Sequence, residues 1–336
     1  MMFTSGRDNL ALTIYAPYDC PNNCSFCTSK KMYSEKKADL QKVIGSINDI
    51  FTNYNFPFKD VVITGGEPTA NILLLAELVN AIPDGMNVYI NTTLLARTFN
   101  EFCYFLVSSF GKKIKGVNVS RHASSYEEET LVLHGIATDE QIAKLASIVP
   151  VRINCVNADK NNYEAIIQRW ENTKIELSFR ADFTTIKTDF DLHNPYNDFA
   201  CLLALRGYYI NHTQCGVCDT VSFKDKSGLS VRYHRGKENT CYRVGQSEMW
   251  KYNDIIIYQD GSISIDWNDN KQTKELTKKA LEYMNIERKP VNYYASINNT
   301  YESTSTCGDY RCGSNGCGMS YAESLYSHGC GSSGCR

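Results

Sequence analysis

The sequence predicts an α/β fold made of repeated strand–helix units. Short apolar runs alternate with stretches of helical periodicity from residue 10 to about 206. Six such units follow one another, which is too regular for strands and helices that segregate along the chain. Alternation of this kind produces parallel βαβ units, and it favours an open or closed barrel over a doubly wound sheet.

Each element is predicted from its own pattern. Strands are expected where apolar and β-branched residues form a short run, as in LALTIYA (10–16) and DVVITGG (60–66). Helices are expected where apolar residues recur every three or four positions, as in residues 37–54. The other expected strands are 87–93, 115–121, 151–157 and 174–183, and the other expected helices are 71–82, 100–110, 139–149 and 161–172.

The alternation stops near Asn211. Residues 220–236 and 254–268 each have the pattern of a hairpin, the second with Asp260 and Gly261 at its turn. One more helix is expected over 273–285. The last part is rich in Cys, Gly and Ser and has too few apolar residues to fold alone. We therefore expect a barrel at 1–210, a small α+β extension at 211–298 and a Cys-rich tail at 299–336.

Composition indicates a globular protein. Hydrophobic residues make up 43% of the 336, charged residues 21%, and the net charge of −2 gives no overall sign of a nucleic-acid or membrane-surface partner. The N-terminal stretch contains Arg7 and Asp8 and does not resemble a signal peptide. No apolar run approaches the ~18 residues that a membrane span needs. A cytoplasmic location without a membrane partner is expected.

The 14 cysteines are unusual for a protein in a reducing cytoplasm, where clustered cysteines more often bind metal or act in catalysis. Cys103, Cys155 and Cys201 stand alone among apolar neighbours and are expected in the core. The others form three groups: Cys20, Cys24 and Cys27; Cys215, Cys218 and Cys241; and Cys307, Cys312, Cys317, Cys330 and Cys335.

The first group has the spacing C-x3-C-x2-C and directly follows the first expected barrel strand. Structural zinc sites are closed by four ligands, whereas an iron–sulfur cluster held by three cysteines keeps one iron open to another ligand. The carboxyl ends of barrel strands are also where such folds place their chemistry. A zinc site completed by a remote Cys or His is the alternative.

The order of two motifs favours the iron–sulfur cluster over the zinc site. Phe26 precedes the last cysteine of the loop, and the next strand ends in GGEP (65–68). With both motifs at successive strand ends, residues ~10 to ~185 resemble the radical S-adenosylmethionine (SAM) superfamily. The resemblance implies a partial (β/α)6 barrel. It also implies a [4Fe–4S] cluster on Cys20, Cys24 and Cys27, with SAM at the open iron.

The resemblance also implies further cofactor contacts. The Gly65–Pro68 segment would receive the methionyl ammonium of SAM, although GGEP also suits a plain strand-to-helix turn with Pro68 at the helix start. The third strand matches the family only in part, because Thr93 stands where that pattern has Gly. The other implied contacts are Phe26 near the adenine, Gly65, Gly66 and Glu67 at the ammonium, Ser120 and Asn154 at the ribose, and Arg121 at the carboxylate.

The resemblance implies reductive cleavage of SAM to methionine and a 5′-deoxyadenosyl radical, which abstracts hydrogen from a substrate. The outcome, an oxidoreductase or a transferase reaction, is not indicated by the sequence. A small reductant such as flavodoxin or ferredoxin is an expected partner.

The later cysteines bear on the substrate. Cys215, Cys218 and Cys241 loosely resemble the auxiliary-cluster domains of peptide-modifying members, and a tail cysteine could complete a second cluster. A zinc site and unligated thiols are the alternatives for this group. The five tail cysteines, most followed by Gly, suit metal ligation, a fused substrate-like segment or a thiol-rich end.

Three functions therefore remain in view. A peptide or protein substrate is favoured because of the cysteines that follow the barrel. The alternative is modification of a nucleotide, tRNA or other nucleic acid, since residues 230–243 interleave basic residues with tyrosines. The third is a zinc-binding protein without catalytic activity.

Overall fold

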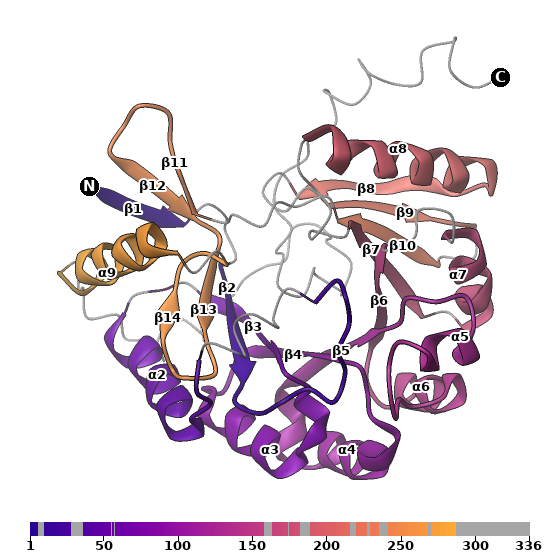
Figure 1. Ribbon diagram of the computed structural model, residues 1–336, viewed down its shortest axis with the longest axis horizontal. Helices are drawn as coiled ribbons and strands as arrows, with labels where there is room; N and C mark the ends of the chain where they lie inside the picture. Colours follow the sequence, from indigo (N-terminus) through magenta and orange to yellow (C-terminus); the bar gives the residue numbers. More distant parts are fainter. Residues whose placement is uncertain are drawn as a thin grey trace.

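An open, curved sheet of eleven strands forms the centre of the molecule, in the order β14-β13-β2-β3-β4-β5-β6-β7-β10-β9-β8. Helices α2, α3, α4, α6 and α7 lie along its outer side (Figure 1). Among the described residues β14 and β8 form two separate edges, so the α/β prediction is confirmed and no closed barrel is formed. This computed structural model describes residues 1–5, 10–27, 36–54, 56, 58–157, 163–173, 175–181, 189–215, 220–226, 229–234, 241–267 and 270–286.

The six predicted barrel strands are present and pair in parallel, each with the next along the chain. Successive residues of a strand point to opposite faces of a sheet. Ile63, Ile90 and Ile153 belong to the core under the helices, which defines the outer face. The strands are β2 (Leu10–Ala16), β3 (Phe58–Gly65), β4 (Asn87–Thr92), β5 (Ile114–Ser120), β6 (Val151–Asn157) and β7 (Glu176–Ala181).

The connecting helices begin at side-chain caps. Asp39 accepts from the backbone N–H of Lys42 at the start of α2, and Thr138 with Gln141 forms a capping box at α6. The helices are α2 (Leu40–Asn53), α3 (Ile72–Ala81), α4 (Phe99–Val107), α5 (Tyr126–Thr130), α6 (Asp139–Ala146) and α7 (Tyr163–Trp170), with 3-10 turns η1 (Pro68–Ala70), η2 (Ala96–Thr98), η3 (Phe110–Lys113) and η4 (Glu171–Thr173).

The part of the chain after residue 210 extends the same sheet at both edges. The two predicted hairpins are present as β9–β10 and β13–β14. One strand of each pairs in parallel with the barrel, β10 with β7 and β13 with β2. These strands are β8 (Tyr209–Cys215), β9 (Thr220–Lys224), β10 (Ser230–His234), β13 (Asp254–Ile257) and β14 (Ile263–Ser264), and helix α8 (Asp189–Leu205) precedes them.

A second, three-stranded sheet lies beside the first and joins the N-terminus to the C-terminal region (Figure 1). Its strands are β1 (Met2–Ser5), β12 (Met249–Tyr252) and β11 (Cys241–Arg243). The last helix, α9 (Lys271–Ile286), packs on β1, where the rings of Phe3 and Tyr283 are 6.1 Å apart. None of the helices in the described ranges combines the length and the apolar character needed to cross a bilayer.

Candidate active site

The three-cysteine loop leaves β2 at the carboxyl end of the sheet and runs over the ends of β3 and β4. Cys20 is exposed, and Cys24 and Cys27 are half-buried. The backbone N–H of Cys27 donates to the carbonyl of Cys24 over 3.2 Å, which turns the loop between its last two thiols. The structure therefore places the loop where the sequence predicts it, with thiols that reach solvent.

Two side chains fasten this loop to the neighbouring strand ends. The Tyr18 hydroxyl donates to the carbonyl of Pro68 over 2.7 Å. The Asn22 amide donates to Thr93 Oγ1 at 3.3 Å and accepts from the backbone N–H of His134 at 2.6 Å. The loop is thus tied to the turn after β3, to the end of β4 and to the segment after α5.

Gly65 and Gly66 allow the cysteine loop to approach the end of β3. Gly65 has a φ of +102°, a conformation that suits glycine. A Cβ at Gly66 would lie 1.9 Å from the carbonyl oxygen of Tyr18. The sequence predicts close approach at these glycines, and in the structure the approaching group is the loop backbone. Their contact with a cofactor stays a prediction.

The Glu67 carboxylate is buried, with an exposed fraction of 1%, and is held by threonines. Its Oε1 accepts from the Thr69 N–H at 2.9 Å, from Thr69 Oγ1 at 2.7 Å and from the Thr92 hydroxyl. Its Oε2 accepts from the backbone N–H and the hydroxyl of Thr93, both at 2.6 Å. Glu67 thereby caps η1 and locks the turn after β3 to the end of β4.

Pro68 stands at the first position of η1, so the GGEP segment forms the strand-to-helix turn that the sequence also suggested. This turn and the predicted cofactor contact are compatible, since the same turn faces the cysteine loop. Next to it, Leu94 has a φ of +54° directly after Thr92 and Thr93, two of the three threonines that hold Glu67. A left-handed leucine is strained, and such strain tends to occur at functional turns.

Arg121 follows β5 and is fully buried. It donates to the carbonyls of Thr93 at 2.8 Å, Ser120 at 2.6 Å and Ala137 at 2.7 Å. Burial lowers the pKa of its guanidinium to about 10. Its described contacts therefore link the ends of β4 and β5 to the start of α6, and a contact with the carboxylate of a ligand stays a prediction.

His122 brings the cysteine loop against β5 and β6. Its ring packs edge-on against Phe26 with the centroids 4.5 Å apart, and its Nδ1 accepts from the Val156 N–H at 3.1 Å. Burial, with Arg121 and Arg180 nearby, lowers the pKa of His122 to about 3. Because Nδ1 accepts, the neutral ring carries its proton on Nε2. At neutral pH His122 is a hydrogen-bond donor rather than a cation.

A buried ion pair fixes the segment that carries His122. Glu129, with no exposed surface, accepts from the His122 N–H at 2.8 and 2.9 Å and from Arg169 Nη1 at 3.1 Å. Arg169 also pairs with Asp139 through two nitrogens, at 2.9 and 2.7 Å. The His122 backbone is therefore held by a charged network of α5, α6 and α7.

Ser120 and Asn154 lie side by side on the inner face. They share one register row of β5 and β6, and Ser178 of β7 continues that row. All three side chains are half-buried. The structure thus brings the two predicted ribose contacts together at the carboxyl end of the sheet.

The three thiols of the loop are the predicted ligands of the cluster. Among the described residues no group of three His, Cys, Asp or Glu side chains is close enough to share one metal ion. In a cluster each thiolate binds a separate iron. Partial burial, together with Glu67, Cys24 and Cys27, raises the pKa of the Cys20 thiol to about 11, although a hydrogen bond from the Asn22 backbone acts to lower it. A bound metal supplies the positive charge that such thiols need to ionise.

The second cysteine group is placed only in part. Cys215 ends β8 of the large sheet, whereas Cys241 begins β11 of the small one. The backbone N–H of Cys241 donates to Asp266 Oδ2 at 2.6 Å, and burial with Asp266 raises its thiol pKa to about 12. Cys218, the side chain of Cys215 and the tail cysteines (Cys307, Cys312, Cys317, Cys330 and Cys335) lie outside the described residues.

The described residues of the basic and aromatic stretch 230–243 do not form one exposed face. Tyr233 is fully buried, and Arg232 is 9% exposed and paired with Glu176. Tyr242, in the small sheet, is 42% exposed. The nucleic-acid alternative therefore loses Tyr233 as a platform for base stacking.

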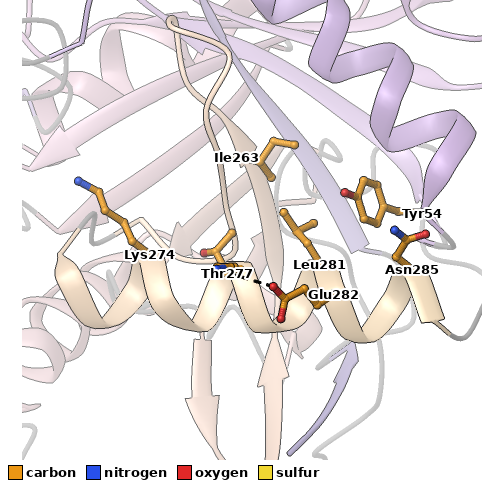
Figure 2. A pocket seen from close by; sticks show the side chains of 8 residues that line it. Tyr54, Ile263, Lys274, Thr277, Leu281, Glu282 and Asn285 are labelled. Carbon is orange, nitrogen blue, oxygen red and sulfur yellow. Dashed lines mark ion pairs between the residues drawn. The ribbon is translucent and has the colours of Figure 1, made fainter.

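A cavity of about 320 Å³ lies along α9, away from the cysteine loop. Figure 2 shows Leu281 of α9 pointing toward Ile263 and Tyr54, with Glu282 on the near side of the helix. Lys278 and Glu282 form an exposed ion pair of 3.9 Å on the same helix. None of the predicted site residues lines this cavity.

Several site residues were not predicted. Tyr18, Asn22 and the threonines around Glu67 are common residue types whose role depends on which strand ends meet. The Glu129–Arg169 pair likewise joins segments 40 residues apart. The partial match of the third strand to the family pattern drew attention to Thr93 alone.

No protein-family model and no curated protein matches this chain. Among solved structures, native anSMEcpe with bound AdoMet (S-adenosylmethionine) is 15% identical and has a TM-score of 0.50 over 83% of this chain and 84% of that one. The same protein with AdoMet and the Kp18Cys peptide is 16% identical, with a TM-score of 0.47 over 82% and 83% of the two chains. This chain shares the fold of anSMEcpe.

Streptococcus suis SuiB bound to S-adenosylmethionine is 18% identical, with a TM-score of 0.43. The match covers 59% of this chain and 45% of SuiB, so this chain matches less than half the length of SuiB.

Proposed function

We propose that this chain is a radical SAM enzyme that binds a [4Fe–4S] cluster through Cys20, Cys24 and Cys27. The observation that carries the proposal is the fastening of a C-x3-C-x2-C loop onto the glycine turn after β3, at the carboxyl end of a parallel sheet. The fold shared with anSMEcpe, whose structure contains AdoMet, supports it.

When bound, the cluster and SAM would supply an electron and a 5′-deoxyadenosyl radical, which takes a hydrogen atom from the substrate. The chain would hold three thiolates on the loop and place Phe26 and His122 beside them. Ser120 and Asn154 would contact the ribose from the inner face. The Gly65–Pro68 segment would receive the methionyl ammonium, with the Glu67 carboxylate held in place by its threonine donors.

A peptide or protein is the proposed substrate, and the two cysteine groups after the barrel support it. A second metal site that includes Cys241 is part of this proposal. A small reductant protein and a cytoplasmic location complete it.

Iron counting on anaerobically reconstituted protein tests the proposal. The wild type is expected to bind at least ~4 iron atoms per chain, and the triple variant Cys20→Ala/Cys24→Ala/Cys27→Ala about four fewer. Cys103→Ala, in α4, is the matched control and should retain all iron. Residual iron in the triple variant would indicate an auxiliary cluster.

Formation of 5′-deoxyadenosine from SAM under reduction tests the activity itself. The triple variant should form none, whereas Cys103→Ala should match the wild type. A protein that binds zinc instead of iron and leaves SAM intact would refute the proposal and support the zinc-binding alternative.

A further inference from the structure

Two arginines and a glutamate form a cluster on the inner face of β6, β7 and β10. Arg152 Nε donates to Glu176 Oε2 at 2.7 Å, and Arg232 Nη2 donates to Glu176 Oε1 at 2.8 Å. Arg152 and Glu176 are register partners. None of the three belongs to the proposed cluster or SAM contacts.

The cluster carries one net positive charge. Burial raises the pKa of Glu176, but the two arginines beside it outweigh this effect and hold the pKa below its usual value. Glu176 is therefore ionised and offsets one of the two guanidinium charges. The side chains are only 11–14% exposed, so water screens the remaining charge weakly.

Arg152 uses only one of its three nitrogen atoms as a donor to Glu176. Its Nε serves Glu176, while Nη1 and Nη2 contact no acceptor among the described residues. These two nitrogens form a planar fork that matches the two oxygens of a carboxylate. Glu176 already binds both arginines with one hydrogen bond to each, so the site accepts a carboxylate.

Arg152 and Glu176 lie directly beneath the proposed cofactor row, and Arg232 is the register partner of Ser178 in that row. Arg152 precedes Asn154 by two residues on β6, so it points to the same face about 7 Å deeper. The neighbouring inner-face side chains of β4 and β5 are neutral: Asn118 donates its amide to Asn91 at 2.8 Å. A substrate carboxylate at Arg152 would therefore hold the adjoining carbon atoms within reach of the cofactor row.

We propose that Arg152 and Arg232 bind a carboxylate of the substrate, so that the substrate is a peptide bearing an acidic side chain or a free C-terminus at the reacting segment. The proposal rests on the proposed function for the identity of the substrate as a peptide. A single net positive charge matches one carboxylate, whereas a phosphate dianion would leave an uncompensated charge.

Affinity selection from a randomised synthetic peptide library tests the proposal on the full-length, reconstituted chain with SAM. The library is used in two forms, with amidated and with free C-termini. Wild-type protein should retain peptides enriched in Asp or Glu from the amidated form, or free-acid peptides over amidated ones. Arg152→Gln should reduce that enrichment about tenfold or more, since a charge-assisted pair is lost.

Glu176→Gln separates binding from a structural role. It leaves both guanidinium groups and removes the internal competitor, so enrichment of acidic peptides should increase. If the cluster only braces the strands, Glu176→Gln should instead lower retention as Arg152→Gln does. Arg206→Gln, which breaks an exposed pair with Glu164 and Glu171, is the matched control and should change nothing.

Retention without carboxylate enrichment, or enrichment unchanged by Arg152→Gln, would overturn the proposal. So would Arg152-dependent retention of a random RNA pool, which would assign the arginines to phosphate. The selection does not require cleavage of SAM. A protein that selects carboxylates but forms no 5′-deoxyadenosine would refute the proposed function and leave this site standing.

Discussion

At the scale of single residues, the Glu67 carboxylate is the best-satisfied group of the candidate site. Its two oxygens accept from the three threonines Thr69, Thr92 and Thr93 and have almost no contact with solvent. A buried acceptor with this many donors is costly to replace, because each donor that loses its partner remains buried.

Glu67→Gln should therefore lower the free energy of unfolding by about 2 kcal/mol or more, since an amide NH2 would face N–H and O–H donors. Urea denaturation measures the change. Glu248→Gln, at a site where the carboxylate is 83% exposed, should change it by less than about 0.5 kcal/mol. Equal stabilities of the two variants would contradict the arrangement around Glu67.

His122 gives a pH-dependent prediction. Its folded pKa of about 3 lies below the ordinary value of 6.5, so the unfolded chain binds more protons between these values. The stability that neutral His122 contributes is present above about pH 6.5 and is lost as the pH falls toward 3. Between pH 7.5 and 5 the wild type should lose about 1–2 kcal/mol more than His122→Gln, whose amide oxygen can still accept from Val156.

Urea unfolding at the two pH values measures this difference. All other titrating groups are common to both proteins. Equal losses of unfolding free energy in the two proteins would therefore show that folding does not lower the pKa of His122.

The positions of the cysteine and GGEP motifs at successive strand ends could be predicted, because each motif is distinctive in the sequence alone. The three threonines and Asn22 were not, since one hydroxyl or amide in a strand end carries no signal until its partner strand is known. Arg121 was expected at a ligand, and burial against three carbonyls gives it an internal role that no local pattern reveals.

At the scale of elements, the cysteine loop and the β3–η1 turn form one unit. Their closest contact is between Gly66 and the Tyr18 carbonyl, and the Tyr18 hydroxyl returns to the carbonyl of Pro68. The position of the three thiols therefore depends on the absence of a side chain at Gly66.

Gly66→Ala should displace the loop, because its Cβ would overlap a backbone oxygen at 1.9 Å. We expect a loss of most reconstituted iron while the core remains folded, measured by iron content and circular dichroism. Gly45→Ala is the control: it lies within α2 with nothing within 4 Å of its Cβ and should stabilise the protein by about 0.5–1 kcal/mol. Full iron binding by Gly66→Ala would refute the coupling.

The Glu129–Arg169 pair should be far more important for stability than an exposed pair. Arg169→Met leaves Glu129 buried without its cation and should cost about 3–5 kcal/mol. Arg206→Met, which removes a pair with Glu164 and Glu171 at the surface, should cost less than about 1 kcal/mol. Similar denaturation midpoints for both variants would contradict the role of the network.

The elements of the barrel were predictable to within a few residues because their apolar periodicity is strong. Helix α8 was missed, since Pro195 interrupts the helical pattern near its start. The short strands β1, β11 and β12 were missed as well, because three or four residues are too few for a periodic signal.

At the scale of the whole molecule, the barrel strands and the later hairpins share one sheet. A separate extension at 211–298 was expected, and its hairpins were recognised in the sequence. The pairing of these hairpins with β7 and β2 could not be predicted from local sequence patterns, because it joins strands that are far apart in the chain.

Calorimetry of the full-length chain should accordingly show β9–β10 and β13–β14 unfolding together with the barrel, in one transition. Asp254→Pro, in β13, should lower the temperature of that single transition, since proline removes a ladder hydrogen bond between β13 and β2. A second transition that Asp254→Pro alone affects would show that the extension is an independent domain.

The parallel pairing of β13 with β2 also has a consequence for synthesis on the ribosome. Strand β2 is among the first elements to emerge, yet its partner is translated some 240 residues later. Until then one edge of the nascent sheet remains unpaired, and exposed edges invite aggregation. Chaperone occupancy should therefore persist on nascent chains until Ile257 has left the exit tunnel.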